Sequence, residues 1–173
     1  VVATALPQIV KNLTSYQVPQ TPKEAFIFSG RIHREQYAIE KYLVKSAGNY
    51  YIPVLWLKPL QSNGKQPVLY FDEIGKEKAL ALGETVDLLA QKGQEVILAD
   101  ISSTGELADG YMKGGDAKID GTSLNLWYAG ILTNQPLVGV RMQEIELVRR
   151  FAHQLTAKPT TNWQVIAKGN ITA

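Results

Sequence analysis

The chain has 173 residues, of which 45% are hydrophobic and 20% charged, and its formal net charge at pH 7 is +2. This length suits one domain, and the composition is that of a folded globular protein and excludes a disordered one. A net charge this small, with basic residues that do not cluster, argues against nucleic acid or a membrane surface as a partner. The sequence contains no cysteine, which excludes disulfides, thiol catalysis and thiolate metal sites.

The first part of the chain predicts a lead-in followed by a hairpin. Residues 1–35 are mixed in character, and we expect an extended or partly helical lead-in segment. Residues 36–45 and 50–57 alternate polar and apolar side chains on either side of a Gly-Asn turn, which predicts an antiparallel hairpin. Pro53 suits an edge strand or a bulge better than a central position.

The rest of the chain predicts buried strands alternating with helices. Short apolar runs at 67–71, 96–100 and 163–167 are typical of strands that are buried on both faces. Such strands, separated by helices, indicate an α/β protein with a parallel sheet.

Two helices are expected between these strands. The first covers residues 76–92, with Leu82 among the apolar residues on or near one face, and Gly93 stands where a helix-ending glycine belongs. The second covers residues 137–155, which are strongly periodic. A Gly- and Asp-rich stretch, 101–122, separates them.

Four stretches carry a resemblance to a known family: QYAIEKYLVKSAGNYYIPVLWLKP, PVLYFDEIGKEKAL, VILADISSTGEL and PLVGVRMQEIELVRRFAHQL. They resemble the bacterial acetylxylan-esterase-like family of α/β-hydrolases. The resemblance implies an α/β-hydrolase-like three-layer sandwich, with residues 36–173 as its N-terminal half. It also implies the spatial order 1-2-4-3-5 for the five expected strands, with 163–167 at an edge.

The resemblance places the family's nucleophile on the turn after the strand 163–167, in a G-x-S-x-G elbow. A serine attacks there only when a histidine accepts its proton and an acid orients that histidine. Lys168, Gly169 and Asn170 occupy this turn, and Gly169 stands at the nucleophile position. Shifting the register places Ile171 there instead. We therefore expect a degenerate elbow and no catalytic residue in this chain.

Other candidate positions follow the strands 67–71 and 96–100, because ligands of open α/β sheets bind at the carboxyl ends of strands. Gly75 could let a backbone amide approach a ligand, whereas Asp72 would repel an oxyanion. Asp72 and Asp100 could also form a carboxylate pair or a metal site, but capping of loops and helix N-termini is the favoured interpretation. The possible ligand-side positions are Asp72, Gly75, Asp100, Ser102 and Ser103.

Ser102 and Ser103 stand where the family's D-x-R-G-x-G stretch has its Arg-Gly core. Hydroxyl residues in such loops are more often turn formers than nucleophiles, and we favour that interpretation. His33 and His153, the chain's two histidines, are poor candidates for a catalytic base, because one lies in the lead-in and the other within a helix.

Further motifs are few. Trp127 and Tyr128 could stack on sugar rings, although packing in the core or as a cap is the favoured interpretation. No metal-ligand spacing and no dinucleotide-binding glycine motif is present in the sequence, so we expect neither a metal nor a cofactor.

Three functions remain open at this point. The first is a non-catalytic α/β-hydrolase domain of a carbohydrate-esterase-like protein. The second is part of an active serine esterase whose catalytic residues lie outside this chain, and the third is a small-ligand-binding α/β domain. We expect a periplasmic or extracellular protein, possible contact with polysaccharide, and a partner at the edge of the strand 163–167, either the remaining half of the fold or another chain, because a bare apolar edge favours aggregation.

Overall fold

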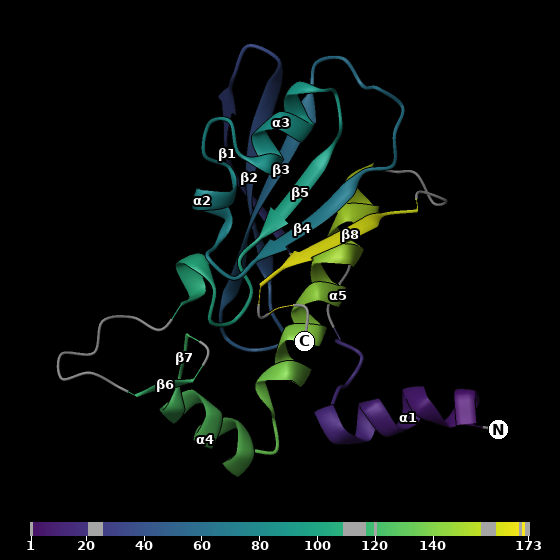
Figure 1. Ribbon diagram of the computed structural model, residues 1–173, viewed down its shortest axis with the longest axis vertical. Coiled ribbons are helices and arrows are strands. Elements are labelled where there is room, and N and C mark those ends of the chain that lie inside the picture. Colours follow the sequence, from purple (N-terminus) through teal and green to yellow (C-terminus); the bar gives the residue numbers. More distant parts are fainter. Residues whose placement is uncertain are drawn as a thin grey trace.

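The computed structural model describes residues 2–20, 26–108, 117–119, 121–156, 162–169 and 171 of the chain. Its centre is a six-stranded mixed sheet with the order β1-β2-β3-β5-β4-β8 (Figure 1). The strands are β1 (Phe26–His33), β2 (Tyr37–Lys45), β3 (Tyr51–Pro59), β4 (Val68–Asp72), β5 (Val96–Ala99) and β8 (Gln164–Lys168). The five expected strands are therefore present in the order that the resemblance implied.

Helices cover both faces of this sheet, which gives the expected three-layer α/β architecture. Helices α2 (Lys76–Ala79) and α3 (Thr85–Gln91) cover one face, and α5 (Leu137–Thr156) covers the other (Figure 1). A 3-10 turn η1 (Gly105–Leu107), a small ribbon of β6 (Lys118–Ile119) and β7 (Thr122–Ser123), and helix α4 (Leu124–Leu132) follow β5.

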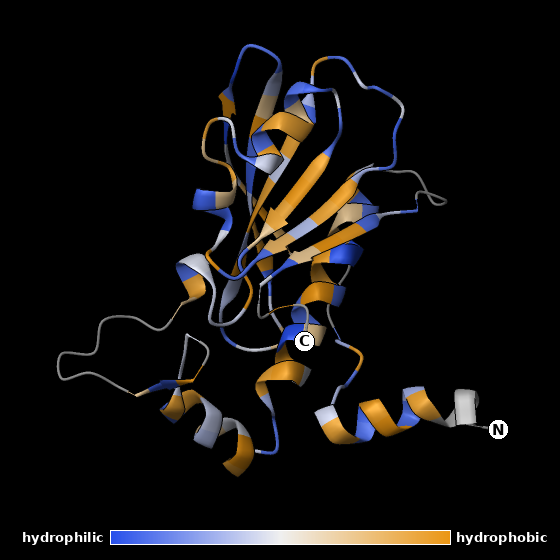
Figure 2. Ribbon diagram, viewed as in Figure 1, coloured by the Kyte–Doolittle hydropathy of each residue, from blue (hydrophilic) through white to orange (hydrophobic). Residues whose placement is uncertain are grey.

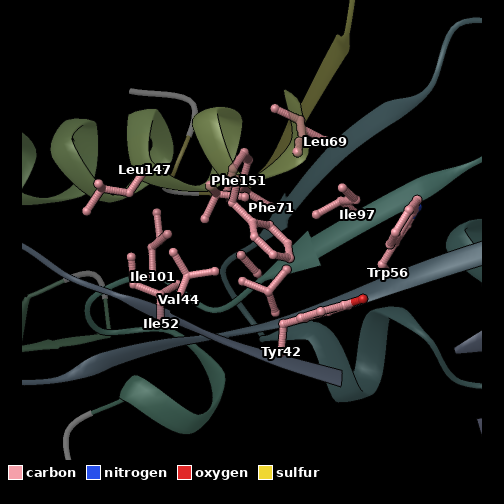
Figure 3. Packing of buried hydrophobic residues seen from close by; sticks show 14 residues of the cluster. Tyr42, Val44, Ile52, Trp56, Leu69, Phe71, Ile97, Ile101, Leu147 and Phe151 are labelled. Atoms are coloured by element: carbon pink, nitrogen blue, oxygen red, sulfur yellow. The ribbon is translucent and has the colours of Figure 1, made fainter. Parts of the chain in front are cut away.

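Alternation along the central strands builds two hydrophobic cores. In β4, Leu69 and Phe71 pack against Phe151 of α5, whereas Val68 and Tyr70 pack on the side of α2 and α3 (Figure 3). Every residue of β4 and β5 is buried, and burial on both faces accounts for the nearly continuous apolar sequence of the two strands (Figure 2).

The lead-in contributes two elements. Helix α1 (Val2–Thr14) lies beside the lower end of α5 (Figure 1), and β1 adds an outer strand that pairs antiparallel with β2. The register of β1 shifts between Phe28 and Gly30, and most of its residues are exposed. The sheet therefore includes a strand that the sequence analysis did not anticipate.

The expectation of one continuous helix over residues 76–92 is wrong, because this segment forms two helices, α2 and α3. Gly83 adopts a φ of 82° between α2 and α3, and Leu82 is 80% exposed instead of packed in the core. The backbone N–H of Gly83 donates to the carboxylate of Asp87 in the first turn of α3, which fixes a new helix start there. Gly93, with a φ of 82°, ends α3 as expected.

Pro53 lies in β3, which is a central strand, contrary to the preference for an edge. Its carbonyl accepts a hydrogen bond from Asp100 N at 3.2 Å, just beyond the end of β5. In a strand, the N–H and C=O of one residue point to the same side. Proline has no N–H, and at Pro53 this gap faces the end of β5, so a proline is tolerated there.

The expectation that residues 163–167 are buried on both faces is also wrong. β8 pairs only with β4, in parallel, and its residues are exposed or half-buried, with Val165 57% exposed. An edge strand leaves a row of backbone N–H and C=O groups that can pair with another chain. β8 is therefore an edge strand despite its apolar composition.

We expect Val165→Lys to reduce self-association of the chain without loss of stability, because a lysine on an edge strand opposes strand pairing. The free energy of unfolding should change by no more than about 0.5 kcal/mol, as for other surface substitutions. Val138→Lys on α5, a position that is 41% exposed, adds the same charge away from the edge. Equal effects of both variants in light scattering would show that charge alone, and not the edge, controls association.

Candidate functional site at the carboxyl edge of the sheet

A pocket of about 260 Å³ lies at the carboxyl ends of β4, β5 and β8. Glu73 and Ile74 follow β4, Ser103 and Thr104 follow β5, and Arg141 comes from α5. Gly121 and Ile171 complete the lining. The chain thus has a pocket where open α/β sheets bind their ligands.

Asp100 directly follows β5 and is buried, with 1% exposure. Its carboxylate accepts a hydrogen bond from Lys76 N at 2.7 Å, one from Lys76 Nζ at 2.6 Å and one from Glu106 N at 2.9 Å. The Lys76 ammonium is itself buried and also pairs with Glu106. Asp100 therefore ties the starts of α2 and η1 to β5, which leaves its carboxylate occupied by the protein.

Two glycines allow the chain to close around this carboxylate. A Cβ on Gly105, whose φ is 47°, would overlap the carboxyl group of Asp100. A Cβ on Gly75, whose φ is 90°, would overlap the backbone of Gly105. Gly75 is thus required for close packing of two loops.

We expect Gly105→Ala to lower the free energy of unfolding by about 2–4 kcal/mol, because the left-handed backbone and the overlap with a pinned carboxylate both add a cost. Gly64→Ala is the matched control, since Gly64 has a φ of 72° and nothing within 4 Å of its added Cβ. Urea denaturation of both variants measures the difference. Equal losses would show that Asp100 can move aside.

A second polar cluster holds the loop after β5 against α5. Glu144 is 1% exposed and accepts hydrogen bonds from Ser102 N at 2.8 Å, Ser102 Oγ at 2.6 Å and Tyr50 Oη at 2.6 Å. Arg141 Nε donates to the Ser102 carbonyl at 2.9 Å. The Ser102 hydroxyl is therefore bound to a carboxylate, with no histidine to accept its proton.

Burial raises the pKa of the Glu144 carboxyl above its ordinary 4.5, although hydrogen bonds from Ser102 and Tyr50 oppose the effect. The folded state then retains a proton that the unfolded state releases. The resulting stability is fully present below the unfolded pKa and is lost as the pH rises through the folded pKa.

We therefore expect the stability of the wild type relative to Glu144→Gln to fall as the pH rises from about 4 to about 7, by about 1.4 kcal/mol for each pKa unit of elevation. Glu146→Gln on the same helix is the control. The pKa of Glu146 is lowered, chiefly by the hydrogen bond from Arg149, so its contribution is lost as the pH falls. Urea denaturation across this pH range checks both signs, and a difference for Glu144→Gln that is independent of pH would contradict the prediction.

Ser103 has a φ of 67°, a backbone conformation that favours glycine, and it stands where the family stretch has glycine. Its Oγ is buried and has no hydrogen-bond partner among the described residues. Ser103 lines the carboxyl-edge pocket, but neither histidine does. A buried hydroxyl without a base nearby is not activated for attack.

The turn after β8 contains a glycine with a left-handed backbone. Gly169 has a φ of 77°, and a Cβ there would overlap the side chain of Glu73. The Lys168 side chain is 60% exposed, with its Nζ 3.8 Å from Asp72 Oδ2, and the Lys168 carbonyl accepts from Glu73 N at 3.2 Å. Asn170 lies outside the described residues.

Asp72 and Asp100 do not act as a pair. Asp72 accepts hydrogen bonds from Ile74 N at 3.1 Å and Tyr70 Oη at 3.2 Å, while Asp100 has the separate set of donors described above. Among the residues that the structure describes, no group of three or more metal-ligating side chains gathers. Both carboxylates thus serve to order loops and helix starts.

The remaining candidates lie away from this pocket. His33 is at the far end of the sheet, and the ring of His153 lies 6.4 Å from that of Trp163. Tyr128 is 60% exposed, so it does not pack in the core, and only the cap interpretation is left open for it. Sequence reasoning missed Lys76, Tyr50 and the contacts of Glu144, because these contacts join residues far apart in the chain.

Known structures resemble this fold. A candidate acetyl xylan esterase from Bacteroides fragilis matches with a TM-score of 0.70 and 16% identity, over 95% of this chain and 46% of that one. The fold is therefore α/β-hydrolase-like. Two further structures match with a TM-score of 0.50 each. One is a methylesterase with 13% identity, over 94% of this chain and 33% of that one. The other is a glucuronoyl esterase from Solibacter usitatus with 10% identity, over 90% of this chain and 48% of that one.

These similarities, at such identities, concern the fold alone, and the chain spans about half the length of these structures or less. No family model matches the sequence, and no curated protein matches it. No helix in the described part of the chain is long and apolar enough to cross a membrane.

Proposed function

We propose that this chain is half of an α/β-hydrolase domain in a carbohydrate-esterase-like protein, and that it has no esterase activity of its own. The proposal is supported by Gly169, which stands where the resemblance places the nucleophile, has a φ of 77° and offers no attacking atom. The hydroxyls of Ser102 and Ser103 do not substitute, since one is bound to Glu144 and the other has no base.

The role left to such a domain is to support a catalytic partner or to contact polysaccharide, in a bacterial protein of the periplasm or the cell exterior. The exposed edge of β8 is the place where we propose that a further segment docks, either the remaining half of the fold or another chain. Val165, 57% exposed on that edge, supports this proposal because covering it would bury apolar surface.

The second candidate is part of an active serine esterase whose catalytic residues lie outside this chain. The share of the Bacteroides structure that is matched, 46%, favours it, because more than half of that protein has no counterpart here. A small-ligand domain of the flavodoxin or Rossmann type is less suitable, because antiparallel strands β1, β2 and β3 precede the parallel ones.

We expect this chain to hydrolyse p-nitrophenyl acetate no faster than a Ser102→Ala/Ser103→Ala variant of it. Hydrolysis that a serine-directed inhibitor abolishes, and that the double variant lacks, would overturn the proposal. Hydrolysis by the complete gene product but not by this chain would favour the second candidate. Absorbance at 400 nm follows the released p-nitrophenolate in all three cases.

A further inference from the structure

A larger pocket, of about 520 Å³, lies at the opposite edge of the sheet. Tyr37 lines it and begins β2, where it pairs with Pro59 at the end of β3, while Leu57 pairs with Val96 at the start of β5. The pocket is therefore at the amino ends of the parallel strands, and Asp87 and Gln91 of α3 line it. Figure 1 shows α3 away from the arrowheads of β4, β5 and β8. We call it the amino-edge pocket.

The wall of the amino-edge pocket is fixed by one buried carboxylate. Asp87, with 0% exposure, accepts hydrogen bonds from Arg34 Nη1 at 3.0 Å, from the Tyr37 hydroxyl, from Gly83 N at 2.9 Å and from Gln91 Nε2 at 2.8 Å. Burial opposes its ionisation, but these hydrogen bonds and the Arg34 charge lower the pKa of Asp87 below its ordinary value. Arg34 and Gln91 are thereby held in place before any ligand arrives.

The charges around the amino-edge pocket favour a neutral ligand. The Arg34 cation is compensated by Asp87, and Glu35 adds a negative charge to the rim, so the pocket does not favour an anion. No described residue forms a hydrogen bond with the side chains of Glu35 or Gln36, which leaves a carboxylate and an amide available. These groups suit a ligand with many hydroxyls that donate and accept at once.

One apolar side chain completes the lining. Leu82 lies in the break between α2 and α3, is 80% exposed, and faces the pocket. No core packing explains a leucine there, whereas a pocket with apolar surface and a few directed polar groups is typical of small-ligand sites, whose volumes run from about 300 to about 1,000 Å³.

We propose that the amino-edge pocket binds a short stretch of a neutral polysaccharide, with Arg34, Gln36 and Gln91 hydrogen-bonded to its hydroxyls and Leu82 against the apolar face of a sugar ring. The proposal deepens the function proposed above and rests on its carbohydrate class. It places the sugar contact at the edge remote from the degenerate elbow. The domain would then hold a polysaccharide without competing for the pocket at the carboxyl edge.

The test is a titration of the full chain with xylohexaose, followed by NMR on the side-chain amide signals of glutamine. We expect the signals of Gln36 and Gln91 to move. Gln36→Ala/Leu82→Ala should weaken binding by at least about tenfold, the loss of one or two hydrogen bonds and an apolar contact. Both side chains are exposed, so thermal unfolding should be unchanged. Gln8→Ala/Leu132→Ala removes the same types of exposed side chain from α1 and α4 and should leave binding unchanged.

Each other result has a separate meaning. Binding that the pocket variant does not weaken, or no binding at all, overturns the proposed site and leaves the absence of esterase activity standing. Tighter binding of an oligogalacturonate than of xylohexaose overturns the neutral class of the ligand. Turnover of p-nitrophenyl acetate with intact xylohexaose binding would instead overturn the non-catalytic assignment and leave the pocket standing.

Discussion

The buried charge pair of Asp100 and Lys76 organises the carboxyl edge of the sheet. A carboxylate at 1% exposure is stable only if nearby groups replace the water it has lost. Here the replacement comes from Lys76, through both its amide and its ammonium, and from the Glu106 amide. The start of α2, the start of η1 and the glycine at 105 all follow from this requirement, because each must come within hydrogen-bond or van der Waals distance of the same two oxygens. The conformation of the loops around the carboxyl-edge pocket thus depends on the ion pair between Asp100 and Lys76.

The two edges of the sheet differ in what their polar groups are free to do. At the carboxyl edge, Asp72, Asp100 and Glu144 are engaged with donors of the protein itself. At the amino edge, Asp87 is engaged in the same way, but it holds Arg34 and Gln91 in a pocket whose rim keeps unbound polar side chains. The proposed lack of a nucleophile after β8 would remove the need to bind a substrate beside that turn. This difference in available polar groups is the reason why we propose ligand binding at the amino edge.

Most of the sheet could be predicted from the sequence, because β2 to β5 alternate or are continuously apolar. β1 was missed because its register shifts at Phe28 and Gly30 and most of its residues are exposed, so it carries no clean buried face. The break at Gly83 was missed because it depends on Asp87 accepting from that amide. At the site, Gly169 could be identified from its position after a strand. The cluster of Tyr50, Ser102 and Glu144 could not, because it forms only when residues separated by 94 and 42 positions meet.

The place of β8 in the sheet has a consequence for folding. The last strand that the structure describes, β8, pairs with β4, so one edge of β4 has no partner until the whole α5 segment has been made and folded back. Pairings between distant segments close slowly, and chains emerge from the ribosome at only about 5–20 residues per second. During that interval the outer edge of β4 leaves backbone N–H and C=O groups unpaired, and Leu69 and Phe71 lack the cover that α5 provides. Chaperone dependence in this protein should therefore be concentrated in the time between synthesis of β4 and docking of β8.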